Sequence, residues 1–185
     1  MIKLVPDRDE VISMVTKYMY SGKILNNVHR GNIVEMMVLS ALGSDWKMVS
    51  LGWHPWDIQF STGPQRIRIQ VTQCAALQLW GPTKKQSIQF GWKKKAPDDF
   101  ERYNPGETIE SEGWFCDIFV VGVHLVEDES ADQVDPKQWE FLVIPTSDLN
   151  PGRNSMVLSK ALLKWKPVKW QDLKTTVEDT INSMN

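Results

Sequence analysis

The apolar stretch at residues 114–126, WFCDIFVVGVHLV, constrains the fold of this chain more than any other segment. It is apolar almost throughout, which predicts a central strand covered on both faces. It is well short of the roughly 18 apolar residues that a membrane-spanning helix needs. A strand of this kind requires neighbouring strands and a covering layer. The chain is therefore expected to build a sheet around it.

Hydrophobic periodicity on either side indicates what surrounds this strand. Helical spacing predicts helices over 7–20 and 31–42 before it, and over 155–164 and 167–182 after it. Alternating patterns predict strands over 46–51, 56–60, 66–73 and 138–145, a turn at 61–64 and a short strand near 86–92. Residues 97–112 are polar and are expected to form a surface loop. The order predicts an α/β (α+β) fold with a mixed sheet flanked by helices, as one domain over residues 1–185.

Composition excludes several classes of protein. The 21 basic and 23 acidic residues give a net charge of −2, which rules out a generally basic nucleic-acid coat but permits a local basic patch. The two cysteines, Cys74 and Cys116, lie far apart, so we expect small buried thiols and no disulfide framework. We expect a cytoplasmic protein without a membrane partner. Most of the nine tryptophans are expected to pack the sheet, which leaves Trp80 and Trp92, beside lysines, as candidate ligand contacts.

Three polar residues inside apolar segments are the most informative for function. Glu35 lies in the second predicted helix, Asp57 in a predicted strand, and Gln70 in the next strand. A buried carboxylate costs several kcal/mol unless a metal ion or hydrogen bonds compensate it. Each also has an ordinary interpretation: Glu35 pairing with Arg30 or Lys47, Asp57 in a turn, and Gln70 on a solvent face. Their order and spacing favour considering them together.

These segments resemble the PD-(D/E)XK nuclease-like superfamily, which has the restriction-endonuclease fold. The resemblance is carried by GNIVEMMVLSALG, PWDIQF and RIRIQVTQ, and extends over about residues 5–180. In that family a helix supplies a Glu, a strand an Asp, and the next strand a Glu or Gln, a spacer and a Lys. Glu35, Asp57 and Gln70 fall on the first three positions, and Thr72 stands where the family has lysine.

The resemblance implies a divalent-metal-dependent DNA endonuclease of restriction or defence type. Asp57, Gln70 and Glu35 would hold Mg²⁺ or Mn²⁺, because hard cations prefer oxygen ligands. Such an ion supports phosphodiester hydrolysis by polarising the phosphate and activating water. The family also implies DNA as the partner and a homodimer as the assembly.

The Thr72 position leaves three interpretations open. Another cation replaces the motif lysine, with Arg68, Lys84 and Lys85 as candidates and Arg68 favoured because it shares a strand face with Thr72. Alternatively, catalysis has been lost and the domain binds nucleic acid or a protein partner. The third interpretation is an interaction protein of unrelated α+β fold.

One lysine-bearing segment is the candidate nucleic-acid contact. It comprises Lys84, Lys85, Trp92, Lys93 and Lys94. Lysines contact the phosphate backbone and an aromatic ring stacks on a base. The ordinary interpretation of such a run is a solvated charged face.

Overall fold

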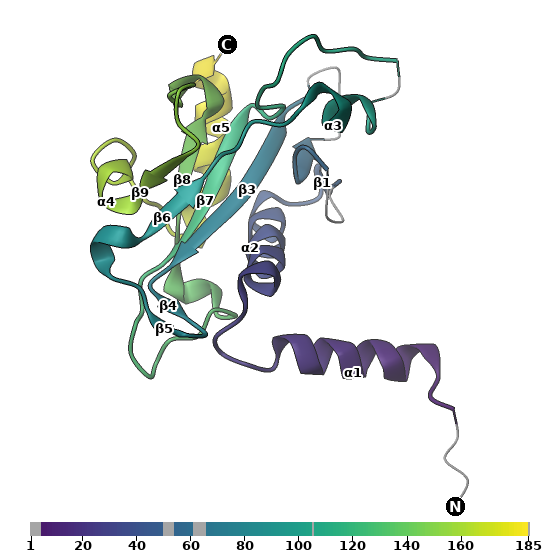
Figure 1. The fold of residues 1–185 in the computed structure, drawn as a ribbon. Helices are drawn as coiled ribbons and strands as arrows, with labels where there is room; N and C mark the ends of the chain where they lie inside the picture. The colour runs from purple at the N-terminus through teal and green to yellow at the C-terminus, as the bar shows by residue number, and fades with distance from the viewer. Residues whose placement is uncertain (1–4, 50–53, 61–65, 105, 185) are drawn as a thin grey trace, which may run out of the picture.

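A five-stranded mixed sheet forms the centre of the molecule (Figure 1). The structure, a computed structural model, describes residues 5–49, 54–60, 66–104 and 106–184. The strand order is β1-β2-β3-β7-β8, with β3 and β7 parallel and the other neighbours antiparallel. The strands are β1 (Trp46–Met48), β2 (Ile58–Phe60), β3 (Arg68–Ala75), β7 (Ile118–His124) and β8 (Trp139–Pro145). The predicted mixed α+β fold is confirmed.

Strand β7 is the central strand that the apolar stretch predicts. All seven of its residues are buried. Ile118 and Val120 pack into one core cluster, whereas Phe119 and Val121 pack into the other. Side chains of a strand alternate between faces, so this division shows that the sheet is covered on both sides.

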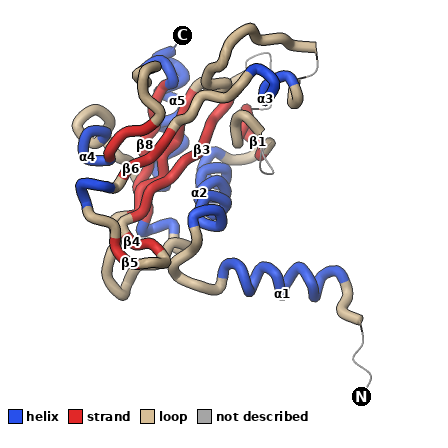
Figure 2. Tube along the Cα trace, in the orientation of Figure 1, coloured by secondary structure: helices blue, strands red, loops and turns tan. Residues whose placement is uncertain are grey.

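Each face of the sheet has its own cover. Helices α2 (Asn27–Leu42) and α5 (Leu173–Met184) pack on one face. The other face is covered by a two-stranded ribbon and two short helices, as Figure 2 shows beside the sheet. These elements are β6 (Gln89–Gly91), β9 (Ser155–Val157), α3 (Pro97–Glu101) and α4 (Leu158–Ala161). A small hairpin of β4 (Leu77–Gln78) and β5 (Gly81–Pro82) completes the described elements.

Helix α2 approaches the sheet very closely at one glycine. A Cβ atom on Gly122 of β7 would lie 2.6 Å from Val34 Cγ1 and 3.2 Å from the Trp139 ring. Real Cβ contacts are not that short, so only glycine lets the helix pack at this depth. This close packing fixes the position of α2, and with it the position of Glu35.

One edge of β3 is only partly covered within the described residues. Strand β2 pairs with Ile69 and Arg68 at the beginning of β3, whereas β7 pairs along Ile69–Ala75 on the other side. Beyond Ile69, the β2 side of β3 therefore presents backbone groups that other partners must satisfy. The motif residues lie at this edge.

Helix α1 (Arg8–Tyr20) stands apart from the layered body (Figure 1). A capping box begins the helix, since the Asp7 side chain accepts from the Glu10 amide and the Glu10 side chain accepts from the Asp7 amide. None of its residues is buried. Its apolar residues therefore do not contribute to the core.

Several predicted elements differ from the structure. The predicted loop at 97–112 contains helix α3, whose first position is proline. The predicted helix at 155–164 is strand β9 followed by the short α4, because Ser155–Val157 pairs with β6. The segment at 167–182 begins with a 3-10 turn before α5. Positions 50–51 of the first predicted strand and the predicted turn at 61–64 lie outside the described residues.

No helix in the described part of the chain combines the length and the apolarity needed to cross a membrane.

Candidate functional site

Asp57 lies immediately before β2 and faces the uncovered edge of β3. Its side chain is 5% exposed. Its Oδ2 atom accepts the Val71 backbone N–H at 2.7 Å and also accepts an N–H from the Gln70 amide. The carboxylate thus satisfies a strand-edge amide that β2 does not reach. These bonds fix Asp57 against β3.

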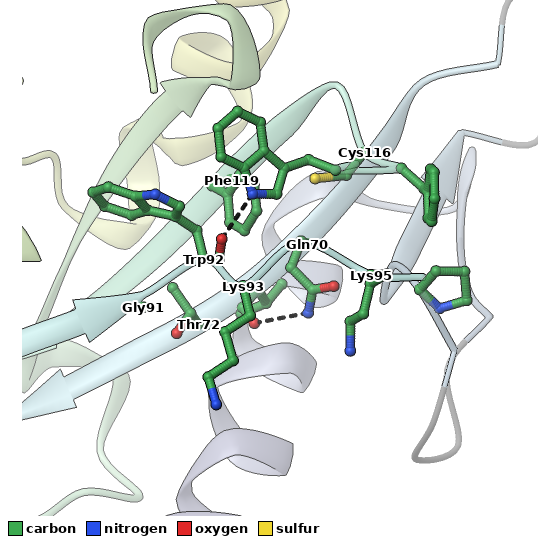
Figure 3. Close-up of a pocket in the computed structure, with 12 residues that line it drawn as sticks. Gln70, Thr72, Gly91, Trp92, Lys93, Lys95, Cys116 and Phe119 are labelled. Carbon is green, nitrogen blue, oxygen red and sulfur yellow. Dashed lines mark hydrogen bonds between the residues drawn. The ribbon is translucent and has the colours of Figure 1, made fainter. Parts of the chain in front are cut away.

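Gln70 and Thr72 lie on the face of β3 that α2 does not cover. Both line a cavity of about 140 Å³ between β3 and the segment that follows β6 (Figure 3). The Gln70 amide nitrogen also lies 3.3 Å from the Val71 carbonyl oxygen. Because this nitrogen faces Asp57, the other end of the amide, its oxygen, is available as an acceptor toward a ligand.

Glu35 approaches the same edge from helix α2. It is half-buried and lines a second hollow with Asn27, Thr72 and Gln73. Burial, followed by the negative charge of Asp57, raises the pKa of Glu35 to about 7. The two carboxylates are therefore electrostatically coupled. Among the described residues, Glu35 forms no ion pair with either Arg30 or Lys47.

Glu35, Asp57 and Gln70 offer two carboxylates and one amide oxygen near this edge, with Gln70 lining the first cavity and Glu35 the second hollow. Within the described ranges, no three His, Cys, Asp or Glu side chains converge as a metal-binding group. A tightly held ion such as structural zinc does not suit such a set. Mg²⁺ does, because it keeps several waters and is often held by only one or two carboxylates. The donors fit a weakly held hard cation.

Two lysines place positive charge beside these donors. Lys93 and Lys95, in the segment after β6, line the cavity with Gln70 and Thr72 (Figure 3). Alternate residues of an extended segment project to the same side, which places Lys93 and Lys95 together. The sequence interpretation assigned Lys93 to nucleic acid and did not propose Lys95 as the missing cation. The sequence signal that includes both is the run of three lysines, residues 93–95, directly after Trp92.

The favoured substitute for the motif lysine, Arg68, is engaged elsewhere. Its guanidinium carbon lies 4.2 Å from the centre of the Trp56 ring and 5.3 Å from that of Phe100. This is cation–π packing against the core. Arg68 does not line the cavity that contains Gln70 and Thr72. The cations that line this cavity are therefore Lys93 and Lys95, and a catalytic role for Arg68 stays a prediction.

Trp92 does not serve as a stacking platform. It is 2% exposed, and its indole N–H donates to the Arg153 carbonyl at 2.8 Å. Stacking on a base would require this ring to leave the core. Lys94 turns away from the cavity, with its ammonium 3.5 Å from the Glu112 carboxylate. Nucleic-acid contact by Lys94 therefore stays a prediction, whereas the buried ring of Trp92 does not fit the stacking expected of it.

The remaining lysines of the predicted patch lie at the other end of β6. Lys84 and Lys85 precede it, and Lys85 lies 3.7 Å from the Glu127 carboxylate. The predicted patch is therefore divided into two groups. Trp80, in the same region, is 79% exposed and lines a hollow with Gln73 and Gln78. It retains an aromatic face that a ligand can reach.

Neither cysteine provides a nucleophile. Burial raises the pKa of both Cys74 and Cys116 to about 12. A thiol with such a pKa contains almost no thiolate at neutral pH. The prediction that both are small buried residues is confirmed.

Comparison of the sequence with models of known protein families and with curated proteins gives no match. The resemblance to nucleases therefore depends on motif residues and geometry alone.

Proposed function

We propose that this chain is a divalent-metal-dependent DNA endonuclease-like protein of the PD-(D/E)XK type. The observation that supports the proposal is that Asp57, just before β2, is linked both to Gln70 of β3 and to Glu35 of α2. The Gln70 amide donates to Asp57, and the charge of Asp57 contributes to the raised pKa of Glu35. A bound cation would offset the repulsion between these two carboxylates and so stabilise both in their ionised forms.

The roles of the residues follow from their chemistry. Asp57, the Gln70 amide oxygen and Glu35 would hold Mg²⁺ or Mn²⁺. Such an ion supplies polarisation of the scissile phosphate and a more acidic water. Lys93 and Lys95 would place positive charge against the phosphate, the task that the family gives to the lysine at the Thr72 position. Trp80, which lies in the turn between β4 and β5, would stack on an unpaired base.

A nuclease assay on plasmid and single-stranded DNA with Mg²⁺ or Mn²⁺ tests this proposal. Asp57→Asn should reduce cleavage about 100-fold or more, in the range seen when one electrostatic catalytic group is lost. Asp179→Asn, an exposed acidic residue of α5, is the matched control and should cleave like the original chain. Cleavage that survives Asp57→Asn contradicts the proposed site.

Metal binding has a readout that does not depend on activity. A bound cation favours ionised Glu35, so added Mg²⁺ should lower the pKa of this carboxyl below about 7. Carboxyl NMR across a Mg²⁺ series measures the shift. An unchanged Glu35 titration at saturating Mg²⁺ contradicts metal binding at this edge.

A second candidate function is a nuclease-fold module that binds nucleic acid without cleaving it. It is favoured by Thr72 at the lysine position and by the neutral Gln70, which together remove charges that catalysis uses. The single variants Lys93→Ala and Lys95→Ala discriminate between the two functions. If either variant loses cleavage while keeping DNA affinity, the lysine is part of the catalytic site. Salt-dependent binding with no cleavage in the original chain supports the binding module.

A further inference from the structure

Helix α1 presents an apolar stripe that nothing in the described structure covers. Val11, Val15 and Tyr18 follow one another at i, i+4 and i+7, the spacing of one helix face. Their exposed fractions are 44%, 49% and 90%. Ile12 and Met14, on either side of this stripe, are also exposed. Five neighbouring exposed apolar side chains are typical of an interaction surface.

The helix is held at one end and projects from the body. The Tyr20 ring lies 5.4 Å from the His29 ring of α2, and the Asn32 amide donates to the Tyr20 hydroxyl at 3.2 Å. The rest of α1 extends away from the sheet (Figure 1). An isolated helix of 13 residues is only marginally stable in water. A partner that covers the stripe would offset this weakness.

The charges beside the stripe favour a second copy of the same helix. Glu10 and Lys17 are seven residues apart, close to two helical turns, so they lie on the same flank of α1. In an antiparallel pair related by a two-fold axis, this flank meets its own copy. Glu10 then lies near the partner's Lys17, and the pair occurs twice. The antiparallel arrangement also opposes the two helix dipoles favourably.

We propose that α1 is a dimerisation arm that packs antiparallel against α1 of a second copy of this chain. The two-fold axis passes between Ser13 and Met14, midway between Glu10 and Lys17. Two arms of this length, each about 20 Å, bury less than the roughly 800 Å² per partner of a standard interface. The dimer therefore forms reversibly as the concentration rises. This interface does not depend on the proposed nuclease activity.

Sedimentation of the full chain over a concentration series tests the dimer. The mass should rise from 21.3 kDa toward twice that value. Val15→Asp should keep the chain monomeric at every concentration tested. Leu163→Asp, at an apolar residue elsewhere that is even more exposed (89%), is the control and should dimerise normally. A monomer at all concentrations, or dimers unaffected by Val15→Asp, would overturn the proposal.

Charge exchange tests the pairing of the flanks. Lys17→Glu alone should weaken the dimer several-fold, and Glu10→Lys together with Lys17→Glu should restore most of that loss. Circular dichroism confirms that α1 remains helical in each variant, because Glu10 also belongs to the cap. Equal weakening by the single and the double variant contradicts the Glu10–Lys17 contact.

Engineered cysteines test the direction of the helices. Val15→Cys lies near the axis and should form an intermolecular disulfide under mild oxidation. In an antiparallel pair, Val11→Cys lies about 7.5 Å along the axis from its own copy, which is beyond the Cα separation that a disulfide spans. A parallel pair would crosslink equally well at both positions. Equal crosslinking therefore overturns the antiparallel arrangement, and the buried native thiols do not compete.

Discussion

Helices α1 and α2 are alike in sequence pattern and opposite in environment. Both have a side-chain N-cap, Asp7 in α1 and Asn26 in α2, and both carry apolar residues at helical spacing. Five residues of α2 are buried, whereas α1 has none. The difference comes from the partners: α2 packs against the sheet at Gly122, whereas in the described part of the chain α1 contacts His29 and Asn32 of α2 through Tyr20. Helical periodicity therefore identifies a face that needs cover without saying what covers it.

The largest expected effect is a difference in stability between a charge placed at a buried position of α2 and the same charge placed at an exposed position of α1. Val38→Asp places a carboxylate at a fully buried site and should lower the free energy of unfolding by more than about 3 kcal/mol. Val15→Asp should change it by less than about 0.5 kcal/mol. Urea denaturation at low protein concentration, where the chain is monomeric, measures both. Similar losses in the two variants would mean that α1 is packed in solution.

A smaller effect on stability is expected at Glu35, a half-buried acidic residue of α2. Its pKa of about 7 lies above its usual 4.5, so protonation favours the folded state. That contribution is complete below about pH 4.5 and is lost as the pH rises through 7. Because the side chain is partly exposed, screening limits the effect to about 1 kcal/mol.

Glu35→Gln should therefore unfold at higher urea than the original chain at pH 8, with little difference between them at pH 4.5. Asp57→Asn removes the second cause, so the pKa of Glu35 should fall part of the way toward 4.5. Urea unfolding at the two pH values and carboxyl NMR measure these changes. If the difference between the original chain and Glu35→Gln is independent of pH, the coupling described for this site is wrong.

The smallest effects come from the two caps. The Asn26 side chain accepts from the His29 amide at 2.9 Å, and its loss in Asn26→Ala should cost about 1 kcal/mol of global stability. Asp7→Ala removes an equivalent bond from α1, so it should reduce the helical signal without moving the global transition. Circular dichroism follows helicity and tryptophan fluorescence follows unfolding of the core. A shift of the core transition in Asp7→Ala would show that α1 is coupled to the body.

Much of the fold could be predicted because it depends on local patterns. The apolar stretch at 114–126 indicated the central strand, and alternation at 66–73 indicated strand β3, whereas its parallel pairing with β7 came from the structure. Periodicity identified α1 and most of α2. The errors at 97–112 and 155–164 lie in short elements, whose pairing with distant segments outweighs local preference.

The candidate site could be predicted only in part. The motif indicated Glu35, Asp57 and Gln70 because those residues lie on regular elements in a recognisable order. It did not indicate Lys93 and Lys95, which reach the cavity from a connecting segment far along the chain. It placed Arg68 in the site because the sequence does not show the Trp56 and Phe100 rings that engage its guanidinium.

The sequence by itself therefore determined which segments are helical or extended, which strand is central, and which polar residues are candidates. These properties depend on periodicity, capping and burial preference over a few neighbouring residues. Only the tertiary structure decided that Asp57 holds the uncovered edge of β3, that Trp92 is buried, that two lysines face Gln70, and that α1 remains uncovered. Each of these depends on contacts between residues distant in the chain, and such contacts are set by how whole layers pack.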